Sequence, residues 1–203
     1  HDRSRFVKML YLSNSRKYIN FREDIVRRKI DALDFDRGKP IVSIGAWVLM
    51  SNHFHLYVTP SQESAVGNPV PLFMAKLCTA YSMYFNKKHK RIGKLFEGPF
   101  KSSHIDNDQY AKYTFSYIHL NPIKLIDPLW KDRGLRNIKS TTKFLDEYYW
   151  SSYHDHRHDN RSENKIISLK NFPEYFSGRE VFDKEIFEWL SFKNCSLDPK
   201  VSP

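Results

Sequence analysis

The sequence predicts an α+β fold, and three of its segments carry that prediction. Residues 41–58 form a run of β-branched and aromatic side chains, which favours one long strand or two nearly continuous strands. Residues 72–88 repeat their apolar side chains at helical spacing, and a further helix is predicted to end at residue 120. A chain of 203 residues with 40% hydrophobic composition can bury one good core around such elements.

Three other segments have helical spacing. Residues 3–12 and 21–34 repeat apolar side chains every three or four positions, and Asn20 is a suitable N-cap for the second of them. Residues 181–190 predict a last amphipathic helix. Two segments lack this spacing: residues 95–105 predict an extended, aromatic-rich stretch, and residues 154–164 predict a solvated loop.

The helix that ends at residue 120 has a predicted start and stop. Asp106 or Asp108 can cap its first turn. Pro122 disfavours helical geometry at Asn121, so the helix is expected to stop there.

The charge of the chain indicates its class of partner. A formal charge of +10 and a pI near 9.5 favour a polyanion, with nucleic acid first and an acidic membrane surface as the competitor. We expect no membrane partner, because no run approaches the ~20 apolar residues of a membrane span, and we find no leader or lipid anchor. Cys78 and Cys195 lack a CxxC spacing, which fits a cytoplasmic protein.

His53 and His55 are the first candidate site. On a strand, residues two apart point to the same face, so both imidazoles are expected side by side. Two neutral imidazoles on one rigid face supply half of a divalent metal site. A pair of half-buried structural histidines is the alternative, and the pair alone does not decide between them.

The helix before Pro122 carries the second candidate site. Counted at 100° per residue, one face holds Tyr110, Tyr113, Thr114, Tyr117 and Asn121. An apolar stripe of Ala111, Phe115 and Ile118 is the expected core face, and His119 on the third side is expected at the surface. Tyr117 and Asn121 lie one turn apart, so a phenol and an oxygen ligand could approach one metal ion. Ordinary packing of the tyrosines is the alternative.

These two sites carry a resemblance to a known family. Residues 49–56, Leu-Met-Ser-Asn-His-Phe-His-Leu, resemble the strand motif of the single-tyrosine HUH transposases, and most of all their REP-associated tyrosine transposase branch. Residues 117–122, Tyr-Ile-His-Leu-Asn-Pro, resemble the tyrosine helix of that branch. The likeness covers about residues 40–153, and it includes an intervening helix and hairpin similar to residues 84–88 and 93–101 and a stretch similar to residues 150–153.

The resemblance implies a fold and a domain organisation. The fold would be the HUH endonuclease fold, a ferredoxin-like antiparallel sheet with helices packed on it. Residues 1–153 would form the catalytic domain, and residues 154–203 a C-terminal extension of loop and helix. The family opens with a strand before its first helix, and we expect that strand to lie upstream of this chain.

The resemblance also implies site roles and a reaction. His53, His55 and Asn121 would hold Mg²⁺ or Mn²⁺, and Tyr117 would be the nucleophile. Tyr117 would attack a phosphodiester of single-stranded DNA, often folded as a hairpin, to form a 5′-phosphotyrosine link and release a 3′-hydroxyl. Two imidazoles and an amide are neutral ligands, so they leave the charge of the ion available to the phosphate.

Seven cations are the candidate DNA contacts, because basic side chains interleaved with rings suit a single-stranded or hairpin DNA. They are Lys76, Lys87, Lys88, Lys90, Arg91, Lys94 and Lys101. The predicted protein is thus a nucleoid-associated prokaryotic transposase, monomeric or a homodimer. Two other functions stay open: a non-catalytic module that binds nucleic-acid hairpins, and a metal-dependent phosphodiesterase that uses water.

Overall fold

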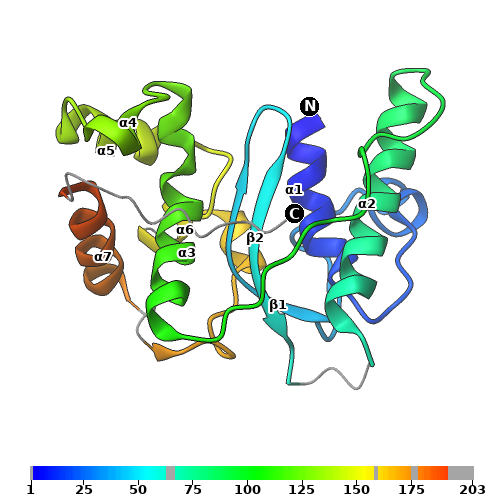
Figure 1. The fold of residues 1–203 in the computed structure, drawn as a ribbon. Coiled ribbons are helices and arrows are strands. Elements are labelled where there is room, and N and C mark those ends of the chain that lie inside the picture. The colour runs from blue at the N-terminus through cyan, green and yellow to red at the C-terminus, as the bar shows by residue number, and fades with distance from the viewer. Residues whose placement is uncertain (1, 63–66, 158–159, 175–177, 192–203) are drawn as a thin grey trace. The chain divides into compact units, whose positions relative to one another are not determined.

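The apolar run at residues 41–58 folds into two strands, β1 (Val42–Leu49) and β2 (Phe54–Pro60), which pair as an antiparallel sheet (Figure 1). The chain reverses between them, and the Met50 amide donates a hydrogen bond of 2.8 Å to the His53 carbonyl oxygen. Ser51 and Asn52, both common turn residues, occupy the reversal. Every residue of β1 is buried. The α+β class and the two strands are confirmed, whereas the turn between the strands was not predicted.

The computed structural model describes residues 2–62, 67–157, 160–174 and 178–191. Unit 1 contains the chain up to Ile44, together with Val58–Lys101 and Ser162–Asn171. Unit 2 contains Gly45–Tyr57, Ser102–Arg161 and the chain from Phe172 onward. Each unit therefore includes part of the hairpin.

The described residues contain no strand outside β1 and β2, apart from an isolated bridge between Val48 and Ser151. The extended stretch at residues 95–105 therefore forms no hairpin, although the family resemblance implied one there.

Unit 1 is built on two helices that pack together, α1 (Asp2–Ser13) and α2 (Pro69–Lys88). The ring of Phe6 meets that of Tyr81 edge-on, with 4.9 Å between their centroids. The buried side chain of Asn14 accepts hydrogen bonds from the amides of Ile41 and Val42 and donates one to the Val42 carbonyl oxygen. One amide thus ties the end of α1 to the start of β1.

The helix predicted over residues 21–34 is shorter than expected. It forms η1 (Phe21–Arg27), a π-helix, with the predicted N-cap Asn20 accepting hydrogen bonds from the amides of Arg22 and Glu23. The prediction fails after Arg27, because Lys29 adopts a left-handed conformation with φ of 54°, which ends helical geometry. The helical spacing that continues past Arg27 therefore belongs to a turn.

Unit 2 holds the tyrosine helix, α3 (Asp108–Leu120), which is followed directly by the 3₁₀-helix η2 (Asn121–Leu125). The N-cap is Asn107, whose side chain accepts from the Tyr110 amide at 2.8 Å, and not Asp106 or Asp108 as predicted. The α-helix stops at Leu120 as expected. Asn121 nevertheless has helical dihedral angles, φ −54° and ψ −39°, because the 3₁₀ turn tolerates Pro122 at its start.

Four further helices complete unit 2. They are α4 (Trp130–Arg133), α5 (Ile138–Glu147), α6 (Tyr153–Arg157) and α7 (Arg179–Ser191). The helix α7 confirms the prediction at residues 181–190, and it packs on both α3 and α6 (Figure 1). The sequence did not predict α4 or α5.

The solvated loop predicted at residues 154–164 is wrong at both of its ends, and residues 158–159 of it lie outside the described residues. Its start belongs to α6, and its end belongs to η3 (Ser162–Ile166) of unit 1. Asp155 is buried and forms an ion pair of 2.6 Å with Arg161. Some of the charged residues that led to the prediction of a solvated loop therefore form ion pairs within the protein. The predicted boundary between residues 153 and 154 stays a prediction.

Candidate active site

His55 lies on β2 and His53 directly precedes that strand, and the two imidazoles lie side by side as predicted. Their ring centroids lie 5.0 Å apart, with the rings nearly perpendicular. His53 is exposed and His55 is half-buried. The Nδ1 atom of His53 lies 2.8 Å from Oδ1 of Asn52, which can only accept a hydrogen bond, so Nδ1 carries the proton. The Nε2 atom of His53 is then left with a lone pair for a metal ion.

Both imidazoles are uncharged at neutral pH. Burial lowers the pKa of His55 to about 4, and the nearby His53 and Lys124 contribute to the shift. Burial and Lys124 also lower the pKa of His53. Neutral imidazole is the form that binds a metal ion, so no proton has to be displaced from either ring at pH 7.

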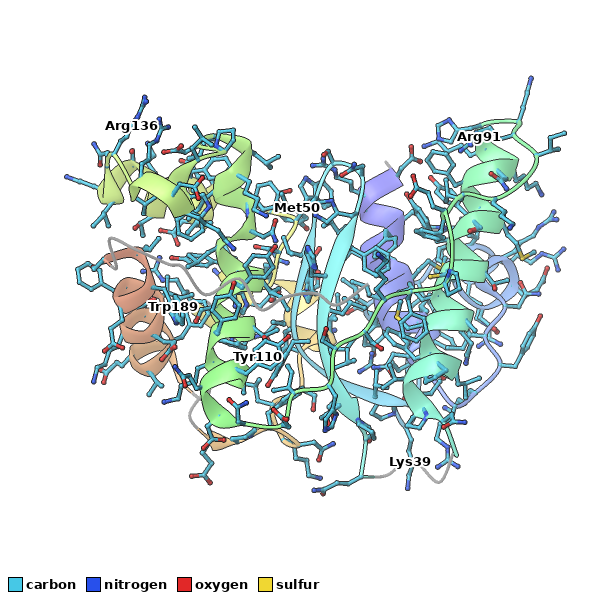
Figure 2. All side chains as sticks on the ribbon, in the orientation of Figure 1. Lys39, Met50, Arg91, Tyr110, Arg136 and Trp189 are labelled. Atoms are coloured by element: carbon cyan, nitrogen blue, oxygen red, sulfur yellow. The ribbon has the colours of Figure 1, made fainter. Side chains whose placement is uncertain are left out.

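The helix α3 brings Tyr117 to these histidines. The Tyr117 ring lies 5.7 Å from the His55 ring, centroid to centroid. Tyr113 stacks on Tyr117 at 6.0 Å and is itself buried, with Trp189 of α7 against its edge at 5.2 Å. Tyr110 lies at the start of α3, and Trp189 lies on the neighbouring helix α7 (Figure 2). Tyr117 is therefore the tyrosine of this face that meets the histidine pair.

Asn121 is a buried amide without a hydrogen-bond partner. Its side chain is 1% exposed, and neither Oδ1 nor Nδ2 finds a partner within the described residues. Such groups are rare in folded proteins, because an unpaired buried amide costs free energy. Asn121 follows Tyr117 by one turn, so its unpaired oxygen suits a ligand that the amide would bind.

Two lysines that the sequence did not single out also reach Tyr117. The Lys124 ammonium donates a hydrogen bond of 3.3 Å to the Tyr117 hydroxyl. The Lys131 ammonium lies 4.3 Å from the centroid of the Tyr117 ring. Seven residues are nearly two helical turns, so Lys124 would share the Tyr117 face if the helix continued. The sequence did not indicate that Lys124 lies near Tyr117, because the helix was predicted to stop before Pro122. The 3₁₀-helix η2 continues the helical path and keeps Lys124 beside Tyr117.

No family model, no curated protein and no solved structure matches the chain. Evidence for its function therefore comes from the geometry of unit 2 and from the sequence motifs.

His119 is buried, which corrects the surface position predicted from the helical wheel. Its ring is 0% exposed and lies against Phe115, Phe182 and His156, with centroids 4.5 to 5.0 Å away. Its Nδ1 lies 2.9 Å from the Phe115 carbonyl oxygen and its Nε2 lies 2.8 Å from Oγ of Ser152. The helical-wheel prediction for His119 was wrong because α7 and the residues around Ser152 cover the side of α3 that was expected to face solvent.

The seven predicted DNA-binding cations lie in unit 1, whereas the histidines, Tyr117 and Asn121 lie in unit 2. Lys87, Lys90, Arg91, Lys94 and Lys101 are exposed. Lys88 is also exposed and pairs with Asp2 at 2.6 Å. The Lys76 ammonium bonds to the carbonyl oxygens of Ser15 and Lys17, and burial lowers its pKa. Lys76 thus holds the segment after α1, and its role in DNA binding stays a prediction.

The described parts of the chain hold no group of three His, Cys, Asp or Glu side chains able to bind a metal ion. The predicted ligand set differs from such a group, because its third member is an amide. Across the same residues, no helix is both long and apolar enough to cross a membrane.

Proposed function

We propose that this protein nicks single-stranded DNA and transfers the strand through a covalent bond to Tyr117, with a divalent metal ion held by His53, His55 and Asn121. The observation that carries the proposal is the contact of two neutral imidazoles with each other and with the Tyr117 phenol. Asn121, a buried amide whose side chain has no partner among the described residues, follows Tyr117 by one helical turn in the same unit. Together these residues match the roles that the HUH transposase motifs imply. The ferredoxin-like HUH fold, the hairpin substrate and an association with the nucleoid belong to the same proposal.

The residues present suit Mg²⁺ or Mn²⁺. Imidazole nitrogens and an amide oxygen are both ligands for these ions, with mixed nitrogen and oxygen ligation leaning toward Mn²⁺. The buried Oδ1 of Asn121 has no other partner, and the imidazoles need not lose a proton. When bound, the ion would polarise a phosphate and offset charge on its oxygens.

The proposed step exchanges one phosphoester for another. The phenol oxygen of Tyr117 bonds to phosphorus, and the bond from phosphorus to the 3′ oxygen breaks. The phenol gives up its proton and the departing 3′ oxygen takes one up, so protons balance across the step. Lys124 donates to the phenol oxygen at 3.3 Å, so its charge would favour that oxygen as it becomes negative.

The energy of the broken bond would be kept in the phosphotyrosine link. A phenoxide is a fair leaving group, so a second 3′-hydroxyl can attack the link and release Tyr117. Lys124 would again stabilise the negative phenol oxygen on release. Of the seven predicted cations, the six other than Lys76 are exposed, and these six are the proposed contacts to the backbone of the folded DNA.

The test is a search for the covalent product. Wild-type protein, single-stranded hairpin DNA and Mn²⁺ are expected to give a protein–DNA band that resists denaturant. Tyr117→Phe should abolish the band while DNA binding persists. Tyr113→Phe is the matched control, because it removes the hydroxyl of the stacked neighbour and should keep the band.

Other outcomes would favour the other functions. A band that survives Tyr117→Phe would contradict the assignment of the nucleophile. Cleavage without a band, unaffected by loss of the hydroxyl, would indicate a phosphodiesterase that uses water. Specific binding that a chelator leaves unchanged, with no cleavage, would indicate a binding module.

A further inference from the structure

We propose that unit 2 has a nucleic-acid surface of its own, which receives the unpaired nucleotides next to the phosphate at Tyr117. This surface, here called the Lys124 surface, consists of Lys124, Leu125, Ile126, Leu129, Lys131 and Arg136. It deepens the proposed function, because it extends from the proposed nucleophile. Its residues belong to unit 2, whereas the seven predicted DNA-binding cations belong to unit 1. In sequence, the residues of the Lys124 surface lie between the Tyr117 motif and the stretch at residues 150–153.

The segment around this surface is strongly basic. Residues 123–143 contain six Lys and Arg side chains and two Asp side chains. One of the two acids, Asp127, is neutralised by Arg133 at 2.6 Å. Arg136 is exposed, and Figure 2 shows its side chain extending outward from the chain between α4 and α5. A polyanion is therefore the partner that this charge favours.

Three large apolar side chains are exposed among these cations. Leu125, Ile126 and Leu129 are 46%, 51% and 55% exposed. The turn that carries them is well bonded, since the amides of Ile126 and Asp127 donate to the Ile123 carbonyl oxygen at 3.0 and 2.8 Å. The apolar side chains are thus held outward by an ordered backbone while the adjacent Trp130 is buried.

The surface is continuous with the proposed nucleophile. Lys124 bonds to the Tyr117 hydroxyl, and Lys131 lies over the Tyr117 ring, so both ends of the turn reach one side chain. A phosphate at the Tyr117 oxygen would lie beside two ammonium groups. The neighbouring nucleotides would then follow the turn, with phosphates near Lys131 and Arg136 and unstacked bases on the apolar side chains.

A second copy of this chain suits the surface less well. In a symmetric dimer the same patch meets itself, so the cations of one copy would face those of the other. Like charges in an interface are unfavourable. Single-stranded nucleic acid instead offers negative phosphates and apolar base faces together, which is the combination that the turn presents.

The test measures binding of a fluorescein-labelled oligothymidylate by the full chain carrying Tyr117→Phe, at several salt concentrations. Lys131→Gln with Arg136→Gln should reduce the slope of log affinity against log salt by about 1.4, or ~0.7 for each lost phosphate contact on a single strand. Leu125→Ser with Leu129→Ser should weaken binding about fivefold or more at an unchanged slope, through lost base contacts. Both pairs are exposed or partly exposed, so thermal melting should show a folded protein.

Lys143→Gln is the matched control, because Lys143 lies on α5 of the same unit and pairs with Glu147 at 3.8 Å. We expect it to keep the parental slope. An unchanged slope in the lysine–arginine pair would overturn the proposal. The proposal would also be overturned if Leu125→Ser with Leu129→Ser converted a dimer into a monomer, measured by sedimentation, while DNA binding stayed unchanged. If the slopes behave as expected but the wild-type protein forms no covalent band, the surface stands and only the proposed chemistry fails.

Discussion

At the scale of single residues, Lys124 connects the structure of the site to its proposed chemistry. Its ammonium donates to the phenol oxygen, which gains negative charge as it loses its proton for attack and again when the phosphotyrosine link is broken. A hydrogen-bond donor of this kind acts mainly on the transition state, because the charge it meets develops there. Its main effect should therefore be on the rate of the covalent step.

Lys124→Gln should slow formation of the covalent band at saturating DNA by about a hundredfold, the usual loss when one such donor is removed. Lys124→Arg retains a cationic donor and should recover much of the rate. The measurement is single-turnover adduct formation, with Lys139→Gln as the control at an exposed cation of α5. Equal rates for wild type and Lys124→Gln would exclude this role.

Ser152 is a buried residue that contributes to the packing behind α3. Its buried Oγ accepts from the Trp47 amide at 2.9 Å and lies 2.8 Å from Nε2 of His119. Because the His119 Nδ1 proton faces the Phe115 carbonyl oxygen, Nε2 accepts the Ser152 proton. One hydroxyl therefore joins β1 to the helix that carries Tyr117.

Ser152→Ala should lower the free energy of unfolding by about 2 to 4 kcal/mol, because it leaves a buried donor and a buried acceptor unpaired. Ser151→Ala is a closely matched control. Ser151 is equally buried, but its hydrogen bonds to Tyr148 and Tyr153 are long, 3.4 and 3.3 Å. Urea unfolding of both variants checks the difference, and similar losses would contradict this account.

At the scale of elements, α3 has its neighbours on more than one side. Its apolar stripe is buried as predicted, while His119 and Ser116 on the third side are buried too. Thr114 and Tyr117 on the tyrosine face remain partly open, as does Lys112 on the third side. The start of this helix is capped by Asn107, whose side chain accepts a hydrogen bond from the Tyr110 amide.

Asn107→Ala should cost about 1 kcal/mol of stability, because it removes the acceptor for the Tyr110 amide at 2.8 Å. Asn107→Asp keeps an acceptor and adds a negative charge at the helix N-terminus, so it should be as stable as wild type. Thermal unfolding compares the two. A loss in Asn107→Asp as large as in Asn107→Ala would show that the cap is not the cause.

At the scale of the whole molecule, stability should depend on pH through buried histidines. Burial lowers the pKa of His156 from 6.5 to about 4, although its Nε2 donates to the Gly45 carbonyl oxygen at 2.9 Å. Between these two pH values the unfolded chain binds more protons than the folded chain. Stability is therefore full above pH 6.5 and falls as the pH drops toward 4.

His156 alone should reduce the free energy of unfolding by about 2 kcal/mol between pH 7.5 and pH 5.0, at ~1.4 kcal/mol for each pH unit below 6.5. Urea unfolding at the two pH values gives the loss for wild type and for His156→Gln. For His156→Gln, the loss of unfolding free energy between pH 7.5 and pH 5.0 should be about 2 kcal/mol smaller than for wild type. Equal losses would mean that His156 is protonated in the folded protein.

Local patterns predicted the two strands, the longer helices and the histidine pair. Alternation along a strand places His53 and His55 together whatever else surrounds them, and helical spacing joins Tyr117 to Asn121. The α+β class, β1, β2, α1, α2, α3 and α7 follow from the same local periodicity. The same patterns gave wrong predictions where other parts of the fold decide the outcome. The helix predicted at residues 21–34 is shorter than expected, and His119 is buried and not at the surface.

The amino-acid sequence therefore specifies local features directly: which residues share a face, which segments form helices or strands, and the net charge of +10. Tertiary packing alone decided which polar residues are buried and which cations reach Tyr117. Lys124 and Lys131 belong to the site only because η2 and α4 fold back over the phenol, and Asn121 is unpaired only because its neighbours exclude water. Such contacts depend on chain reversals and on burial, which periodicity over a few residues does not specify.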